Sequence, residues 1–259
     1  MSAGSVGQFP ARDGLKLVYR TLGQGRPLIL LHGYTSSGGQ LIDGGLPGAL
    51  AQGGYRVIVP DLRGHGDSPR PHDPAAYPPE VLADDVLALA GLLGLSEDDY
   101  DLGGYSLGAR IVLRMLVRGA RPARAVVGGQ GLDAVSQSTG RTGGYRRVLA
   151  ALASGEPLEP GSPEAAQAYW ITRAGGDPLA LTYVLNTHVA TPVAALDDID
   201  SRTLVAVGDQ DVSHASGDAL AAALPHGRFT RVPGNHYTAL GSPEFAAAVV
   251  SFLGDAASE

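Results

Sequence analysis

The sequence contains no cysteine, which excludes disulfide bonds and thiolate metal ligands. Lysine occurs once, at Lys16, and the formal net charge at pH 7 is −7. Because a nucleic-acid surface needs a local excess of lysine and arginine, we expect no nucleic-acid partner. Long apolar runs are also missing: no segment approaches the ~18 consecutive apolar residues of a membrane span, and residues 1–10 have neither a basic start nor an apolar stretch. These absences favour a cytoplasmic protein without a membrane partner.

The chain length limits the number of domains. With 259 residues, the chain can bury the core of one large domain but is short for two average domains and a linker. Hydrophobic residues make up 44% and charged residues 17% of the chain, which is the composition of an ordinary globular protein. We therefore predict a single α/β domain over residues 1–259.

Strand-like apolar runs alternate with helix-like segments along most of the chain. The continuous apolar run at residues 27–31 is typical of a central strand covered on both faces, whereas residues 80–93 have apolar positions at helical spacing. Such alternation predicts a mostly parallel, doubly wound sheet with helices on both faces. The strand-like runs cover residues 15–22, 27–31, 55–60, 99–102, 123–129, 203–208 and 229–232.

The alternation stops between residues 130 and 200. Three segments there have helical character, with glycine, proline and serine between them, and none has the pattern of a strand. We interpret residues 130–200 as a small helical lid inserted between strands. Its large side chains are candidates to line a substrate pocket, although their helical spacing also fits simple packing. These side chains are Tyr169, Trp170, Tyr183 and Leu185.

Residues 101–110, Asp-Leu-Gly-Gly-Tyr-Ser-Leu-Gly-Ala-Arg, have the pattern of a nucleophile elbow. Positions two before and two after the serine of such a strand-to-helix turn must lack bulk, and Gly104 and Gly108 occupy them. The turn would raise the Ser106 hydroxyl above the sheet edge and aim the Leu107 amide at an oxyanion. A chain with 37 glycines also produces Gly-x-Ser-x-Gly by chance, so the assignment depends on residues found elsewhere.

Two earlier strand-like runs also end in polar, glycine-rich stretches. His32 follows the first of them, and the amide of Tyr34 is a candidate second oxyanion donor; the alternative is a surface loop with a capping histidine. Residues 61–68 follow the next run and contain aspartate, histidine and glycine. We interpret them as a loop held by its own hydrogen bonds rather than as catalytic groups.

The last two strand-like runs end in an acid and a histidine. Asp209 and Asp211 follow the first run, and His236 follows the second. A serine hydroxyl is a poor nucleophile, so it needs an imidazole to take its proton and a carboxylate to orient that imidazole. The order serine, acid, histidine is the one that elbow-bearing hydrolases use. On ligand chemistry alone, a metal site at Asp209, Asp211 and His214 is the alternative.

Four motifs in sequence order resemble those of the α/β-hydrolase superfamily, and the resemblance covers nearly the whole chain. They are His32-Gly33, the stretch at 61–66, Gly-Tyr-Ser-Leu-Gly at 104–108, and Gly208-x-x-Asp211 with Asn235-His236. The resemblance implies an α/β-hydrolase fold with a sheet of about eight strands.

The same resemblance implies a catalytic triad. Its nucleophile is Ser106, its base is His236 and its acid is Asp211, which the spacing after the glycine favours over Asp209. Asn235 departs from the glycine that usually precedes the histidine. The oxyanion donors are the amides of Tyr34 and Leu107. Candidate substrate-binding residues are His32, Tyr105, Arg110, Trp170 and Tyr237.

The residue at the elbow, Ser106, limits the class of reaction. Haloalkane dehalogenases and epoxide hydrolases of the superfamily carry aspartate there, whereas Ser106 favours a carboxylesterase that acts on a small-molecule ester, thioester or lactone without cofactor or metal. A carbon–carbon hydrolase or a lyase of menaquinone synthesis is an alternative, since Arg110 resembles the carboxylate binder of such lyases. For Arg110 itself we favour the interpretation as a helix-surface residue. A ligand receptor that keeps the triad is another alternative. The sequence does not indicate an oligomeric state.

Overall fold

The structure is a computed structural model that describes residues 4–137 and 142–255. In these ranges eight strands form one sheet: β1 (Ser5–Pro10), β2 (Lys16–Leu22), β3 (Arg26–Leu31), β4 (Tyr55–Pro60), β5 (Asp101–Tyr105), β6 (Arg124–Gly128), β7 (Arg202–Gly208) and β8 (Gly227–Val232). Their order is β1-β2-β4-β3-β5-β6-β7-β8. The pairs β1–β2 and β2–β4 are antiparallel, and all the others are parallel. The mostly parallel sheet of about eight strands is therefore confirmed.

Two strands differ from the sequence prediction. β1 was not predicted, because it is an edge strand in which only Phe9 is buried, so its pattern shows no apolar run. It is held by backbone pairing with β2, from Ser5 opposite Thr21 to Pro10 opposite Lys16. β5 begins at Asp101 and continues to Tyr105, beyond the predicted end at residue 102, since Gly103 and Gly104 have no side chains to reveal the strand.

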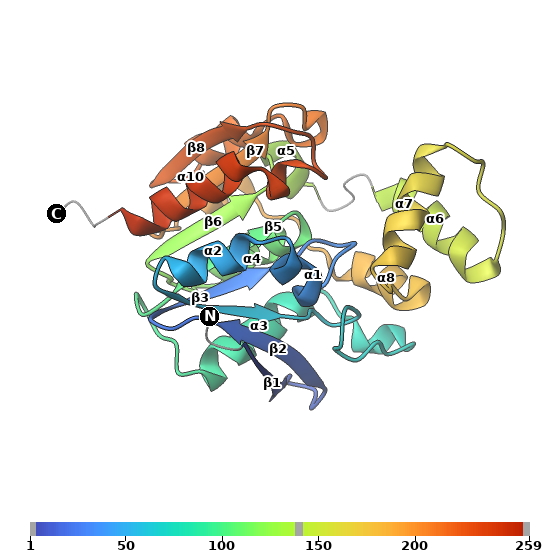
Figure 1. Ribbon diagram of the computed structural model, residues 1–259, viewed down its shortest axis with the longest axis horizontal. Helices are drawn as coiled ribbons and strands as arrows, with labels where there is room; N and C mark the ends of the chain where they lie inside the picture. The colour runs from blue at the N-terminus through green and yellow to red at the C-terminus, as the bar shows by residue number, and fades with distance from the viewer. Residues whose placement is uncertain (1–3, 138–141, 256–259) are drawn as a thin grey trace.

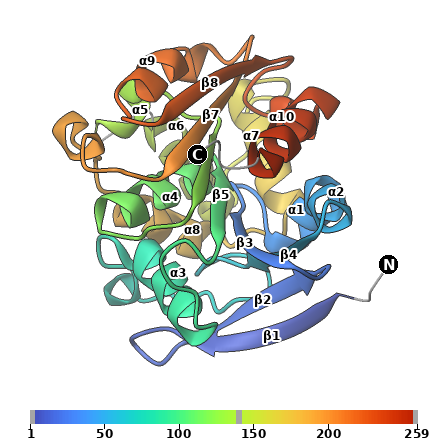
Figure 2. The same ribbon diagram turned by 90° about the vertical axis from the view of Figure 1, so that its left-hand side faces the viewer.

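Helices cover both faces of the sheet, as Figures 1 and 2 show. Along β3, Leu28 and Leu30 belong to the core under α2 (Leu46–Gln52) and α10 (Pro243–Gly254). Ile29 and Leu31 belong to the core under α3 (Val81–Leu92) and α4 (Leu107–Val117). The doubly covered central strand is thus confirmed. The helices are α1 (Gly38–Asp43), α2 (Leu46–Gln52), α3 (Val81–Leu92), α4 (Leu107–Val117), α5 (Leu132–Val135), α6 (Thr142–Ser154), α7 (Pro163–Arg173), α8 (Pro178–Val184), α9 (Gly217–Ala222) and α10 (Pro243–Gly254), with 3-10 turns at Pro74–Ala76, Leu185–Thr187, Val193–Leu196, Val212–His214 and Ala239–Gly241.

The chain between β6 and β7 contains the group of helices α6, α7 and α8. Figure 1 shows α6 and α7 beyond the end of the sheet, with α8 between them and the rest of the molecule. The three helices bury Leu149, Ile171 and Leu181 between them. We call α6–α8 the cap. Of the insertion predicted at 130–200, residues 138–141 lie outside the described residues.

Among the helices of the described ranges, none combines the length and the apolar character needed to cross a bilayer.

Candidate active site

Ser106 occupies a sharp turn between β5 and α4. Its φ of 55° lies in the left-handed region, which is uncommon for a residue with a side chain. A Cβ on Gly104 would lie 2.4 Å from the carbonyl carbon of Gly108, and a Cβ on Gly108 would lie 2.4 Å from the carbonyl oxygen of Leu31. The turn therefore closes only with glycine at both positions. It presents the serine hydroxyl at the carboxyl end of the parallel strands.

The structure brings Ser106, His236 and Asp211 into one chain of hydrogen bonds. Ser106 Oγ lies 2.9 Å from His236 Nε2, and His236 Nδ1 lies 2.7 Å from Asp211 Oδ2. An ionised carboxylate only accepts, so His236 donates through Nδ1 and its Nε2 accepts from the serine hydroxyl. Three strand ends, those of β5, β7 and β8, supply the three side chains. The arrangement can take a proton from the serine and stabilise the resulting imidazolium.

The carboxylate of this chain belongs to Asp211 and not to Asp209. Burial opposes the ionisation of Asp211, but hydrogen bonds from His214 and His236 outweigh it and hold its pKa well below the ordinary carboxyl value. The exposed Asp209 instead accepts from the amide of Gly234, at 2.9 Å. The geometry therefore agrees with the choice that the spacing favours.

Two backbone N–H groups lie close to the serine. Leu107 is the first residue of α4, where an N–H has no partner within its own helix. Tyr34 lies in the loop after β3, and the neighbouring Gly33 abuts the elbow, since a Cβ there would lie 3.7 Å from Ser106 Cβ. Within the described residues, neither N–H donates a backbone hydrogen bond. Both are therefore available to an oxyanion that forms beside Ser106.

His32 is a candidate for substrate binding, but it packs inside the loop of residues 32–37 after β3, which we call the oxyanion loop, and does not line the cavity above Ser106. It is fully buried; its Nε2 accepts from the amide of Leu62 at 3.1 Å, and its Nδ1 donates to the carbonyl of Gly33 at 2.8 Å. Burial, and then the neighbouring His65, lower the pKa of His32 to about 3, so the ring is neutral at pH 7. Since the Gly33 carbonyl and the Tyr34 N–H belong to the same peptide unit, His32 fixes the direction of that N–H.

The side chain of Tyr34 attaches the cap to this loop. Its hydroxyl donates to the carbonyl of Leu181 in α8, at 2.8 Å, and its ring meets the ring of Tyr145 in α6 edge-on, at 5.0 Å. The hydroxyl of Tyr145 in turn lies 3.3 Å from that of Tyr237, the residue after His236. The cap thus contacts the oxyanion loop and also residues 233–238, the loop after β8, which we call the histidine loop.

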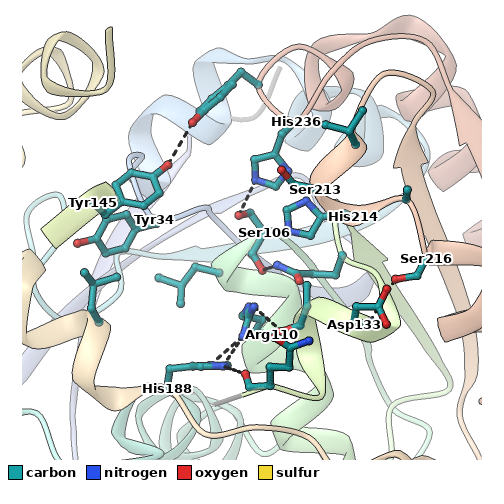
Figure 3. Close-up of a pocket in the computed structure, with 18 of the residues that line it drawn as sticks. Tyr34, Ser106, Arg110, Asp133, Tyr145, His188, Ser213, His214, Ser216 and His236 are labelled. Carbon is teal, nitrogen blue, oxygen red and sulfur yellow. Dashed lines mark hydrogen bonds between the residues drawn. The ribbon is translucent and has the colours of Figure 1, made fainter. Parts of the chain in front are cut away.

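A cavity of about 680 Å³ opens above Ser106, between the sheet end and the cap (Figure 3). Its size is that of a small-molecule site. Of the candidate substrate-binding residues, Arg110 and Tyr237 line it. Other lining residues include Tyr34, Ser106, Leu107, Gln130, Asp133, Tyr145, Val184, Leu185, His188, His214 and His236.

Two other candidates lie elsewhere. Trp170 does not line the cavity: α7 turns Ala168 and Ile171 inward, which leaves Trp170 on the outer face with 51% of its surface exposed. Tyr169 and Tyr183 do not line it either, whereas Leu185 does. Tyr105 is buried behind the histidine loop, where its hydroxyl donates to the carbonyl of His236 at 2.7 Å. Tyr105 therefore contacts the histidine loop and does not line the cavity.

Arg110 gives the cavity a half-buried positive charge. Its guanidinium donates to the imidazole of His188 and, at 2.6 Å, to the carbonyl of Ala134. Burial lowers the pKa of Arg110 to about 10, so the group stays charged at neutral pH, and burial with the charge of Arg110 lowers the pKa of His188 to about 4. Among the described residues, no carboxylate forms an ion pair with this charge.

His214 is not among the residues predicted for the triad, but the structure places it against Asp211 and His236. The three side chains offer ligand atoms within 4.8 Å of one another. Asp211 accepts from both imidazoles, so each of these atoms already has a hydrogen-bond partner without an ion. The alternative metal site with Asp209 does not form, since that side chain faces Gly234. The spacing of three residues between Asp211 and His214 was the one signal in the sequence.

Comparisons with known proteins agree with the fold. A family model for the alpha/beta hydrolase fold matches residues 26–131, which contain the oxyanion loop and the elbow. The non-heme chloroperoxidase CPO-A1 of Kitasatospora aureofaciens is 36% identical over 107 residues, which cover 41% of this chain and 37% of that protein. Bifunctional epoxide hydrolase 2 of Sus scrofa is 33% identical over 125 residues, which cover 48% of this chain and 22% of that protein. The chain thus spans less than half the length of these curated relatives.

Solved structures match nearly the whole chain. A thermophilic esterase from Thermogutta terrifontis has a TM-score of 0.77 at 24% identity, over 96% of this chain and 98% of the esterase. An esterase from Rhodococcus sp. ECU1013 has a TM-score of 0.73 at 26% identity, over 96% of this chain and 98% of that chain. With the sheet order and the family model, these matches show that the chain has the α/β-hydrolase fold.

Proposed function

We propose that this protein is a serine hydrolase that cleaves a carboxylic ester, a thioester or a lactone of a small molecule through an acyl-enzyme. The observation that carries the proposal is the chain of contacts from Ser106 Oγ to His236 and on to Asp211, at 2.9 and 2.7 Å. The N–H groups of Tyr34 and Leu107 beside the serine support it, because acyl transfer develops a negative charge on the carbonyl oxygen.

The reaction follows from the hydrogen-bond roles. His236 Nε2 takes the hydroxyl proton while Ser106 Oγ attacks the carbonyl carbon, and the Tyr34 and Leu107 N–H groups hold the oxyanion. The oxyanion collapses, the carbon–oxygen bond to the leaving group breaks, and His236 gives its proton to the departing oxygen. A water then attacks the acyl-enzyme with His236 again as base. The carboxylic acid leaves, and the serine recovers its proton.

The relatives support acyl transfer to different extents. The two esterases match the chain over almost its whole length. The epoxide hydrolase relative matches less than half of it, and Ser106 replaces the aspartate that the resemblance implies for that chemistry. A serine here favours esters over epoxides.

The direct test is a fluorophosphonate probe together with simple aryl esters. We expect the probe to add to one residue, Ser106, and p-nitrophenyl acetate and butyrate to be turned over, because the hydroxyl is held against its base. Peptide mass spectrometry locates the adduct, and nitrophenol release measures turnover. Labelling of a different residue would contradict the proposal. Labelling of Ser106 with no turnover, but with stabilisation by ligands, would favour the receptor alternative.

A second candidate function, cleavage of a carbon–carbon bond, is favoured by Arg110. A half-buried guanidinium without a carboxylate partner suits a substrate that carries a carboxylate. Substrates of both candidate reactions can carry such a group. Failure with esters and turnover of a 1,3-diketone or a dienoate would reverse the order of the two.

Substituting Arg110 with methionine should separate charged from neutral substrates. For the p-nitrophenyl monoester of adipic acid, we expect kcat/KM to fall by about tenfold or more, because the carboxylate loses its half-buried partner. For p-nitrophenyl hexanoate, which is of similar length and uncharged, we expect a change of less than about threefold. Steady-state kinetics with both esters measures the difference.

The matched control for this experiment is Arg121→Met. Arg121 is an exposed arginine that pairs with Asp200, far from the cavity lining, so its substitution should affect neither ester. An equal loss on both esters in Arg110→Met would contradict a substrate-binding role and assign the arginine to holding His188 and Ala134 in place.

A further inference from the structure

The catalytic carboxylate accepts hydrogen bonds from two imidazoles. His236 Nδ1 lies 2.7 Å from Asp211 Oδ2, and His214 Nδ1 lies 3.0 Å from Oδ1 and 3.2 Å from Oδ2. The carboxylate is buried, with 1% of its side chain exposed, so water does not share this charge. Both imidazoles must therefore present an Nδ1–H to the same group.

His214 also lies flat against the catalytic ring. It ends the 3-10 turn that follows Asp211, and this turn brings its ring to 4.5 Å from that of His236 with 22° between the planes. Figure 3 shows the two imidazoles side by side above Ser106. The ring that takes the serine proton is thus in contact with a second ring that shares its counter-ion.

Of the described groups in contact with His236, Asp211 is the one that carries a full negative charge. Burial is the main cause that lowers the pKa of His214; the bond to Asp211 opposes it, and His236 and Arg110 add to it. His214 is therefore a neutral donor at pH 7, and a second imidazolium beside His236 would be repelled. The titratable and charged groups that face His236 or its contacts are Asp211 after β7, His214 in the 3-10 turn, Tyr105 in β5, Tyr237 in the histidine loop, Tyr145 in α6 and Arg110 in α4.

We propose that His214 is a positioning residue that shares the charge of Asp211 with His236, so that the catalytic imidazole gives up its proton, and the enzyme becomes active, at lower pH than with the carboxylate to itself. A hydrogen bond donated to a carboxylate stabilises its charge locally and weakens its hold on any other proton. The bond from His214 to both oxygens also fixes the rotation of the carboxylate about its Cβ–Cγ bond. The inference rests on the proposed function, since it assigns His236 as the base.

Two substitutions separate the hydrogen bond of His214 from its ring. His214→Phe keeps a flat ring against His236 but removes the donor. His214→Asn keeps an N–H donor at the place of Nδ1 but removes the ring and its titration. If the shared charge matters, the two variants differ in pH dependence even where their rates fall alike.

The measurement is kcat/KM for p-nitrophenyl butyrate from about pH 4.5 to 8. In His214→Phe we expect the acid limb to move to higher pH by roughly 0.5–1 unit, so that kcat/KM on that limb falls about three- to tenfold further below its plateau. In His214→Asn we expect the limb to stay within about 0.2 unit of wild type. A lower rate with an unmoved limb in both variants would overturn the proposal and leave His214 a structural residue.

A second readout does not need turnover. The titration of His236 is followed by NMR in the resting protein with labelled histidine, and the signal is assigned by its loss in His236→Gln. The same upward move in His214→Phe supports the proposal, and its absence overturns it. If Ser106 gives no esterase activity while this titration still moves, the proposed function fails and the shared charge stands. If activity is normal and neither readout moves, the reverse holds.

Discussion

Replacing Ser106 with alanine should lower kcat for an aryl ester by at least about 10³-fold while the protein remains folded. The side-chain oxygen of Ser106 lies 2.9 Å from His236 Nε2, so alanine leaves the base with no hydroxyl to activate. The backbone of the elbow and the two oxyanion N–H groups persist, and they account for any residual rate. Initial rates with p-nitrophenyl butyrate measure the loss, and thermal unfolding reports whether the fold survives.

The matched control for Ser106→Ala is Ser96→Ala. Ser96 is an exposed serine that bonds Asp99 before β5, at the end of the sheet opposite the site. This variant should keep full activity and full labelling by the fluorophosphonate. Near-normal turnover in Ser106→Ala would refute the assignment of the nucleophile.

Replacing Asp211 with asparagine should lower kcat by about 10⁴-fold, the loss typical of a triad whose aspartate becomes asparagine. The amide is neutral, so the imidazolium that His236 becomes in the transition state loses its counter-ion. The amide can also present its N–H₂ to His236, and the ring would then hold its proton on Nε2, where it blocks the serine. Since His214 points at the same oxygens, the substitution disturbs both imidazoles. Steady-state kinetics measures the loss.

Asp209→Asn is the matched control for Asp211→Asn. Asp209 is exposed and accepts one bond from the Gly234 amide, which an asparagine oxygen can also accept. We expect its kcat to stay within about threefold of wild type. A large loss in Asp209→Asn with a small loss in Asp211→Asn would exchange the two roles and contradict the hydrogen bonds of the site.

The parts of the site that the sequence predicts are those that local chemistry marks. The turn itself requires Gly104 and Gly108, because a Cβ added at either position would lie 2.4 Å from a backbone atom. Asp211 and His236 follow the last two strands, at the sheet edge where the loops of parallel strands meet. In each case a short segment carries enough information to place the residue.

The parts that the sequence misses depend on contacts between distant segments. Trp170 has the chemistry of a pocket residue, but the inward face of α7 is set by packing against α6 and α8. His32 was a candidate for binding substrate, and its partner Leu62 lies thirty positions away. β1 is held by pairing along an exposed edge, which leaves no hydrophobic pattern to detect. Residue type and spacing do not carry such information.

Tyr34 contributes its backbone N–H to the site and its side chain to the attachment of the cap, and this limits how the protein can be redesigned. Its amide faces the site of the oxyanion, while its phenol ties α8 to the loop. Trimming residue 34 to admit bulkier substrates would also cut this tie, so selectivity and cap attachment cannot be engineered separately at this position. A library meant to broaden the substrate range is better directed at Val184 and Leu185, which line the cavity from the cap side.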